Sequence, residues 1–405
     1  MPAALVPDTR IHHGTPEFRR TTLALFSAGF ATFALLYCIQ PLMPLFARDF
    51  HVSAAESSLS LSLTTGLLAP AMIVAGVVSE ARGRKPMMVG SLLASSVLMI
   101  VSAFITNWRV FLVVRALAGI TFAGLPAISM AYLSEEVHPT SIGFGMGLAI
   151  GGNGLGGMVG RLLTALITDL SSWRWAISAI GVLGLAATAI FWRSLPPSRH
   201  FSPRPIAVRA LLRTFRAQFG DRRLVALFAM GFLLMGAFVT TYNYATYHLL
   251  EAPYALSQAA VGFIFVVYLV GIFASAWIGS LADRAGRRRM LLLMTIVMLA
   301  GVALTLARPL ALVVIGIATV TFGFFGGHSV ASSWVGLRAH EAKAQAAALY
   351  LFFYYIGSSV AGSVGGLFWD RAHWPGVTAF VGALLLAGTT ISWLAGKDRS
   401  AVVGP

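Results

Sequence analysis

Two short stretches of this 405-residue chain each place a carboxylate among several cationic side chains. One reads GVVSEARGRKPM, from Gly76 to Met87, and the other reads GSLADRAGRRRM, from Gly279 to Met290. A carboxylate that faces guanidinium groups forms short, charge-assisted and often bidentate hydrogen bonds, and glycines beside it permit a tight turn. The pattern therefore predicts a polar clasp that fixes one arrangement of the surrounding segments.

We call these residues the charged motif, and it occurs as two copies. A loop that merely carries positive charge is the alternative interpretation, but positive charge alone requires neither the acid, nor the glycines, nor the duplication. The first copy consists of Gly76, Glu80, Gly83, Arg84 and Lys85, and the second consists of Gly279, Asp283, Arg284, Gly286, Arg287 and Arg288.

Two further arginines, Arg115 and Arg161, lie inside long apolar runs. Counted at about 1.5 Å per residue from the middle of each run, they share a layer with Tyr37 and Gln40. Because a charge inside a membrane span is costly, both guanidinium groups are expected to face protein or water, where they contact substrate or couple to protons. A structural arginine bonded to backbone carbonyls is the alternative for each. The other cavity candidates are Asn153, Tyr242, Asn243, Tyr268, His328, Tyr354 and Tyr355.

Polar chemistry inside the apolar runs is limited. Buried phenols need hydrogen-bond partners, so Tyr354 and Tyr355 are expected to line a cavity, with helix packing as the alternative. Histidine is the side chain that can titrate near neutral pH, so His328 is a candidate for proton transfer, although a packing role is favoured for it. The middle of every run lacks Asp and Glu, so the site is expected to prefer an anionic or a neutral hydroxylated compound over a lipophilic cation. Proton coupling would use His328, an acid at a span end or the substrate's own proton.

These side chains require helices that cross a bilayer. Hydrophobic residues make up 58% of the chain and charged residues only 11%. This hydrophobic share is larger than the core of a soluble protein needs. Runs of about 20 apolar residues predict membrane-spanning helices. The predicted spans are 22–46, 57–79, 86–106, 109–133, 142–168, 173–193, 224–249, 257–282, 289–307, 309–336, 343–369 and 375–395.

The basic residues orient the predicted spans. Lys and Arg number 29 against 14 Asp and Glu, a formal charge of +15. In a soluble protein this balance would suggest nucleic-acid binding. Here the cations lie mostly between apolar runs, on the even-numbered loops, which is the pattern of cytoplasmic loops and predicts that both termini are cytoplasmic.

The chain has a single cysteine, Cys38, so it cannot form an intrachain disulfide.

The predicted spans divide six and six. We expect a cytoplasmic tail over 1–21, a bundle over 22–193, a basic linker over 194–223, a second bundle over 224–395 and a tail over 396–405. Within the linker, one face of a predicted amphipathic helix carries Arg209, Arg213 and Arg216, which suits a helix on the cytoplasmic lipid surface; a solvated tether is the alternative.

The two bundles are related by an internal repeat. LVVRALAGITFAG, 112–124, aligns with LVVIGIATVTFGF, 312–324, and the glycine-rich stretch 151–162 aligns with 355–370. Secondary transporters are built from such repeats, as two bundles that rock around a central site. The glycines expected to pack helices together are Gly119, Gly152, Gly156, Gly157, Gly160, Gly357 and Gly362.

The form Gly-x-x-x-Asp-Arg-x-Gly-Arg-Arg, between the second and third spans of each bundle, resembles the hallmark of the major facilitator superfamily. The first copy departs from it at Glu80 and Ala81. This resemblance covers the whole chain and implies an all-α polytopic membrane protein with two pseudo-symmetric six-helix bundles. It also implies that the charged motif acts as a conformational latch, which bridges the bundles at the cytoplasmic face in one conformation.

Finer features are similar to the twelve-spanner drug:proton antiporter branch of the superfamily. RALAGITFAG, with Arg115 and Gly119, resembles its buried Arg-x-x-x-Gly element. The stretch 147–161 takes the place of its glycine-rich antiporter motif, but lacks the usual Gly-Pro. Together with LLYCIQPLMP in the first span, it most resembles a YnfM-like group of inner-membrane efflux proteins.

The resemblance implies a proton-linked exporter in the inner membrane, whose substrate is a small organic solute such as a drug-like compound, a sugar or an organic anion. The exporter is expected to function as a monomer, without a cofactor, a metal site or a nucleic-acid partner. No enzyme signature and no P-loop occur in the sequence. An uptake symporter for an organic anion or sugar is the first alternative. The second is a non-transporting membrane sensor or lipid-handling protein on the same scaffold.

The latch interpretation makes a direct prediction. Asp283→Asn removes the carboxylate charge of the second copy, so it should nearly abolish transport while leaving folding and membrane insertion intact. Transport in vesicles and the amount of inserted protein are the two measurements. Transport at the wild-type rate would reduce the motif to a topology signal.

Overall fold

The computed structural model describes residues 10–203, 208–339 and 342–394. Within these ranges all named elements are helices, and one parallel bridge pairs Ile11 with Val137. The expected tail 396–405, the first part of the expected tail 1–21 and linker residues 204–207 lie outside the described residues.

The N-terminal half holds the first group of helices. Several begin with a side-chain cap; for example, Ser53 and Glu56 form a reciprocal capping box at the start of α3. The elements are α1 (Pro16–Tyr37), η1 (Gln40–Leu42), α2 (Met43–Phe50), α3 (Ala54–Arg82), α4 (Arg84–Ser102), α5 (Trp108–Phe122), α6 (Pro126–Glu136), α7 (Pro139–Leu170) and α8 (Trp173–Ser194).

The C-terminal half follows the linker helix α9 (Val208–Phe219). Its last element is interrupted by the non-helical backbone of Ala372 and His373, where two helices meet at a kink. The elements are α10 (Arg222–Leu250), α11 (Gln258–Ile264), η2 (Phe265–Val267), α12 (Tyr268–Ala285), α13 (Arg287–Leu304), α14 (Leu310–Arg338) and α15 (Lys343–Leu394).

Helices cover all of the twelve predicted spans, with three differences in detail. Among the described residues, nine helices are long and apolar enough to cross a membrane. The number is smaller than twelve because α5 and α6 are separated at 123–125, because α15 contains two predicted spans, and because α13 begins with three arginines. The all-helical expectation is confirmed, whereas the count of twelve crossings and the cytoplasmic termini stay predictions.

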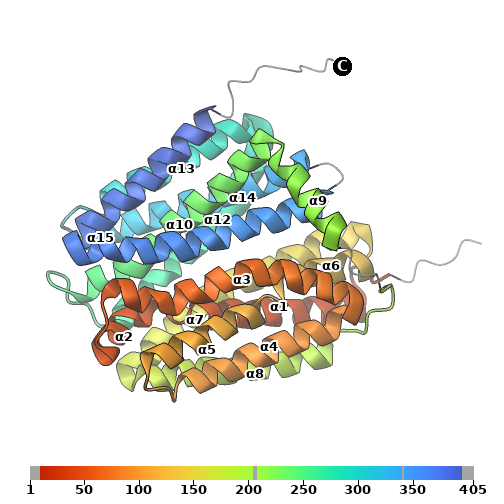
Figure 1. Ribbon diagram of the computed structural model, residues 1–405, viewed down its shortest axis with the longest axis horizontal. Coiled ribbons are helices and arrows are strands. Elements are labelled where there is room, and N and C mark those ends of the chain that lie inside the picture. Colours follow the sequence, from red (N-terminus) through yellow and green to blue (C-terminus); the bar gives the residue numbers. More distant parts are fainter. Residues whose placement is uncertain (1–9, 204–207, 340–341, 395–405) are drawn as a thin grey trace, which may run out of the picture.

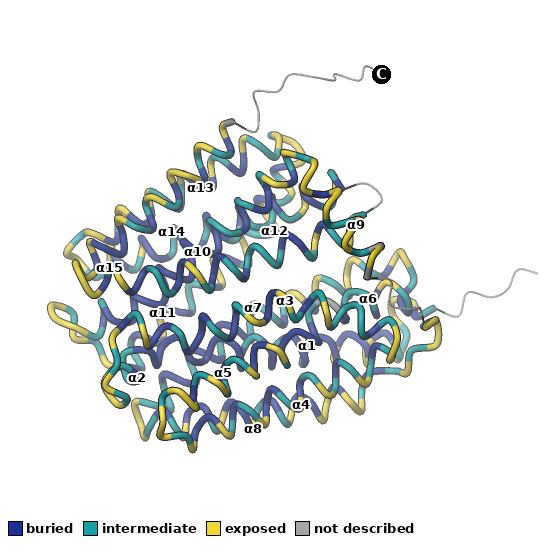
Figure 2. The backbone as a smooth tube through the Cα atoms, viewed as in Figure 1, coloured by how far each residue is buried: buried dark blue, intermediate teal, exposed yellow. Residues whose placement is uncertain are grey.

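The two halves form two stacked groups of helices, red to yellow-green below and green to blue above in Figure 1. The first helix of each half is the most enclosed, since 72% of the most apolar window is buried in both α1 and α10. Figure 2 shows the same distribution, with dark blue concentrated between the halves and yellow on their outer surfaces. The first helices of the two repeats therefore occupy equivalent central positions.

Glycines bring α1 and α7 into direct backbone contact. A methyl group added at Gly152, Gly156 or Gly160 would collide with backbone atoms of α1. The same is true of Gly119 against Thr64, on α5 and α3, and of Gly357 against Phe232, on α15 and α10. Such close approach is the packing mode of membrane helices with small residues at their interface.

We therefore expect Gly156→Ala to lower the thermal unfolding midpoint of the purified protein, at a cost of about 1–3 kcal/mol for overpacking. Gly151→Ala, on the same helix, is the matched control, because its added methyl group meets no atom within 4 Å. It should leave the midpoint unchanged or slightly raised. Equal midpoints for the two variants would contradict this account of the α1–α7 contact.

Candidate functional site

Arg161 of α7 lies in a cage built by both halves. Its side chain is 2% exposed. Nε donates to Oε1 of Gln40 at 2.7 Å, and Nη1 donates to the carbonyl of Gly157 at 2.6 Å. The guanidinium carbon lies 4.4 Å from the ring centroid of Tyr37, 4.8 Å from that of Tyr268 and 5.2 Å from that of Phe265. Cation–π attraction and two hydrogen bonds therefore hold a buried charge without a carboxylate.

Gln40 relays this contact to the other half. Its Nε2 donates to Oδ1 of Asn243 on α10 at 2.7 Å, so Arg161, Gln40 and Asn243 form one chain of hydrogen bonds across the two halves. The expected layer of Tyr37, Gln40 and Arg161 is thus brought together. Asn243 and Tyr268 join it from the C-terminal half.

Other hydrogen bonds join the halves near this chain. The hydroxyls of Ser57 and Tyr247 are 2.6 Å apart, and the hydroxyl of Ser359 donates to the carbonyl of Ser62 at 2.6 Å. Gln258 donates to the carbonyl of Pro41. We call this region the joined end. Within the described ranges, no hydrogen bond or ion pair connects the halves at the opposite end, where both copies of the charged motif lie.

The remaining candidates of the C-terminal half surround the joined end. Tyr242 bonds Thr321 through their hydroxyls at 2.7 Å. Tyr354 and Tyr355 pack edge to face, with ring centroids 5.1 Å apart. Both interact electrostatically with the hydroxyl of Tyr37, so these phenols of α1 and α15 lie in the same region of the protein.

His328 lies farther along α14 from this cluster. Its Nδ1 is 2.9 Å from the hydroxyl of Tyr350. Its ring is stacked on Phe324, with centroids 5.9 Å apart, and tilted against Tyr354, with centroids 4.9 Å apart. The histidine therefore has both a hydrogen-bond partner and a packed aromatic environment, within one half of the protein.

Two sequence candidates lie apart from the Arg161 cage. Arg115 is enclosed in the N-terminal half, where Nε donates to the carbonyl of Ser60 at 3.0 Å and Nη2 has no partner among the described residues. The carboxamide of Asn153 faces Gly29, at the α1–α7 contact. Counting residues along a span predicts the depth of a side chain but not the side of the helix on which it lies, so Arg115 had been predicted to share the layer of Arg161.

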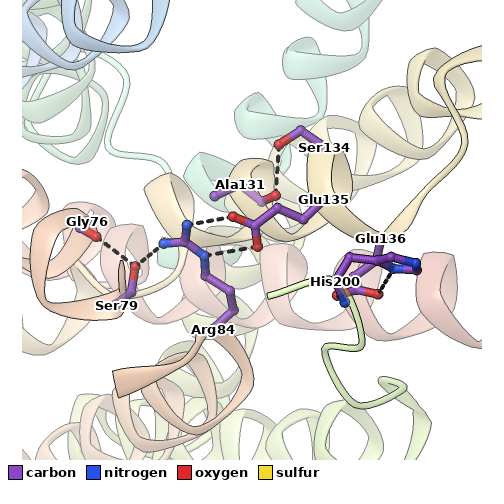
Figure 3. A network of polar contacts seen from close by, with 8 residues as sticks. All are labelled: Gly76, Ser79, Arg84, Ala131, Ser134, Glu135, Glu136 and His200. Carbon is purple, nitrogen blue, oxygen red and sulfur yellow. Dashed lines mark hydrogen bonds and ion pairs between the residues drawn. The ribbon is translucent and has the colours of Figure 1, made fainter. Parts of the chain in front are cut away.

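The first copy of the charged motif is bonded within its own half (Figure 3). Arg84 makes two bonds to Glu135, Nη2 to Oε1 at 2.6 Å and Nε to Oε2 at 3.2 Å. Its Nη1 donates to the hydroxyl of Ser79 at 2.6 Å. Arg84 is thus fixed to α6 and to the end of α3, while Glu80 has no bonded partner among the described residues. Gly83 separates α3 from α4 with φ = +96°, a conformation that favours glycine.

The second copy differs from the first. Asp283 pairs with Arg287 one helical turn away, and its carboxylate side chain is 62% exposed. Arg288 donates to the carbonyl of Trp393 at 2.6 Å, at the end of α15. Gly286 has φ = +91° and takes the place of Gly83. Between described residues, neither copy has a hydrogen bond or ion pair to the other half, so the expected bridging contact stays a prediction for another conformation.

The same end of the molecule carries polar contacts that the sequence did not reveal. The buried carboxylate of Glu136 accepts hydrogen bonds from the backbone N–H and Nδ1 of His200 in the linker, both at 2.9 Å (Figure 3). Only the acidic turn at 135–136, which departs from the basic pattern of the neighbouring loops, pointed to this cluster. In the described residues, no three His, Cys, Asp or Glu side chains are grouped to hold a metal.

Asp221 and Arg338 form a comparable pair in the C-terminal half. Oδ2 of Asp221 is 2.7 Å from Nε of Arg338, which ties the start of α10 to the end of α14. Burial alone would raise the pKa of Asp221, but the hydrogen bond from Arg338 and the backbone N–H groups of Arg223 and Leu224 lower that pKa below its usual value. This stabilisation is present above the pKa of the unfolded carboxyl and is lost as the pH falls through the folded pKa.

We predict that Glu135→Gln lowers the thermal unfolding midpoint, because the buried Arg84 guanidinium loses its charged partner at a cost of about 1–3 kcal/mol. Glu80→Gln is the matched control and should leave the midpoint in detergent unchanged, since Glu80 has no bonded partner to lose. A midpoint that falls equally in both variants would show that Glu80 supports this state.

Sequence comparison identifies relatives along nearly the whole chain. The model of the Major Facilitator Superfamily matches residues 25–256 and 238–403. The chain is 50% identical over 397 residues to the MFS-type transporter YybF of Bacillus subtilis (strain 168), covering 98% of each chain. It is 48% identical over 380 residues to the inner membrane transport protein YnfM of Escherichia coli (strain K12), covering 94% of this chain and 91% of YnfM.

Solved structures share the fold at low sequence identity. A bacterial homologue of the human lysosomal transporter Spinster, in an inward-facing conformation, matches with a TM-score of 0.79 and 13% identity over 96% of this chain and 100% of that one. The nucleoside transporter NupG matches with a TM-score of 0.75 and 15% identity over 93% of this chain and 100% of that one. The protein is therefore a multi-pass protein of the inner membrane, and it belongs to the Major Facilitator Superfamily of transporters.

Proposed function

We propose that this protein exports a small organic solute by proton-linked alternating access. The observation that carries the proposal is the one-sided connection between the halves. Gln40 with Asn243 and Ser57 with Tyr247 join them at one end. At the other end, the bonds that the charged motifs make to described residues lie within their own halves, as in Arg84 with Glu135 and Arg287 with Asp283. A carrier that is closed toward one side of the membrane and open toward the other has this pattern of contacts.

The cavity of the proposed carrier would follow one face of α1. Phe26, Phe30, Phe33 and Tyr37 recur at helical spacing, and the three phenylalanines are only half-buried although their neighbours on α1 are enclosed. This face ends at the Arg161 cage. Near the start of α1 and α7 lies a pocket of about 430 Å³, to which Phe26 contributes. The aromatic face thus leads from that pocket to the joined end.

The spans offer few groups for proton coupling. The middle of every predicted span lacks Asp and Glu, so we assign the proton to His328 or to the substrate itself. The hydrogen bond from His328 to Tyr350 lies on the C-terminal side of the proposed cavity. The carboxylate of Glu80, which has no bonded partner among the described residues, would bind the other half when the end opposite the joined end closes. The latch interpretation requires such a contact.

Alternating access can be tested with a single cysteine. In a Cys38→Ser background, Phe30→Cys should react with a membrane-impermeant thiol reagent from the cytoplasmic side of resting vesicles. An imposed proton gradient should shift part of the labelling to the periplasmic side, because the joined end must open during transport.

Phe104→Cys is the control, since residue 104 follows α4 at the joined end and is 77% exposed. It should be labelled from the periplasmic side under every condition. Labelling of Phe30→Cys from one side only, with gradients of either direction, would rule out alternating access.

A further inference from the structure

Hydrogen-bond donors without partners gather around Arg161. The guanidinium uses Nε and Nη1 for Gln40 and Gly157, while Nη2 donates to no described residue. The Tyr268 ring is 4.8 Å from the guanidinium carbon, and its buried hydroxyl also has no partner in the described ranges. A buried polar group without a partner calls for an explanation. Nη2 can only donate and the hydroxyl of Tyr268 can donate as well, so a single acceptor would satisfy both groups.

The positive charge of Arg161 is equally unbalanced. The stretches around the cage, 18–48, 137–168, 222–250 and 252–282, contain no Asp or Glu. A buried cation is costly when no anion pairs with it, and aromatic rings offset only part of this cost. An anion that enters from the cavity would supply the missing negative charge.

We propose that Arg161 binds the carboxylate of a singly charged organic anion, which accepts hydrogen bonds from Nη2 and from the hydroxyl of Tyr268. The inference rests on the proposed transport function and names the substrate class for that cavity. One free guanidinium nitrogen and one positive charge match a single carboxylate. A doubly charged phosphate ester would bring a second charge that nothing in the cage compensates.

The walls of the cavity indicate the body of this anion. Phe30 and Phe33 lie on the α1 face that ends at Tyr37, and the rings of Tyr354 and Tyr355 approach from the other half. Aromatic rings pack best against other rings in offset or edge-to-face geometry. The substrate class that fits both features is therefore an aromatic monocarboxylate.

Three probes that share one carbon skeleton separate charge from shape. 2-Naphthoate has the charge and the planar body, 2-naphthamide keeps the body without the charge, and decahydronaphthalene-2-carboxylate keeps the charge without the planarity. Isothermal titration calorimetry on the purified full-length protein gives the three dissociation constants. 2-Naphthoate should bind most tightly, and the neutral amide about 10-fold or more weakly because it cannot neutralise the guanidinium.

Two variants test the residues. Arg161→Gln should weaken 2-naphthoate binding by about 10- to 100-fold. Tyr268→Phe removes a hydroxyl that has no partner in the described protein, so it should fold as the wild type and weaken binding by about 5- to 10-fold. Arg174→Gln is the matched control. Arg174 stacks 4.1 Å from the ring of Trp173, outside the cavity, and its replacement should leave binding unchanged.

Equal binding of the amide and the carboxylate would overturn the proposal, as would wild-type affinity in both Arg161→Gln and Tyr268→Phe. If Arg161→Gln does not fold, the affinity of Tyr268→Phe for 2-naphthoate tests the proposal alone, and wild-type affinity in that variant overturns it. Equal affinity for the decahydronaphthalene acid would overturn the assignment of a planar body. Failure of all three probes, with two-sided labelling of Phe30→Cys intact, would remove this substrate class and leave the transporter function standing. One-sided labelling would remove the transporter function itself.

Discussion

A guanidinium group in the middle of an apolar bundle must be stabilised, and in this protein its stabilisation requires both halves. Arg161 donates one hydrogen bond to a carbonyl of its own helix and one to Gln40, and rings from both halves surround it. Each cation–π contact contributes about 0.5–2 kcal/mol, depending on desolvation. In the proposed carrier, opening the joined end would remove the contacts of Arg161 with Phe265 and Tyr268 and would expose the charge to water. The cost of burying one arginine is thereby coupled to the conformation of the whole molecule.

Glycines make this geometry possible. The contact between α1 and α7 brings Gly152, Gly156 and Gly160 against the α1 backbone, so the two helices cannot shift independently. In the proposed carrier, Tyr37 and Gln40 would therefore keep their positions relative to Arg161 during a movement of the bundle. Rigid packing within each half and few polar bonds between the halves are the physical conditions for a rocking motion.

Much of the N-terminal site could be predicted from the sequence, because helical rise and the cost of a buried charge place Tyr37, Gln40 and Arg161 in one layer. The same arithmetic placed Arg115 there, but depth along a span does not determine which side of the helix a residue occupies, and Arg115 lies inside its own half. The bond from Gln40 to Asn243 joins residues 203 positions apart. Hydrophobic periodicity describes each helix by itself, so it carries no information on how the two halves meet.

The duplicated charged motif shows how two similar sequences come to differ in the folded protein. In the first copy, Arg84 is buried and held by two bonds to Glu135, an interaction that is costly to break in a site shielded from water. In the second, the exposed pair of Asp283 and Arg287 contributes little to stability. The carboxylates that can change partners at a low cost in free energy are therefore Asp283 and Glu80, which has no bonded partner in the described part of the chain. If the end opposite the joined end closes, these two acids would form the new bonds between the halves, while Arg84 would keep α4 fixed to α6.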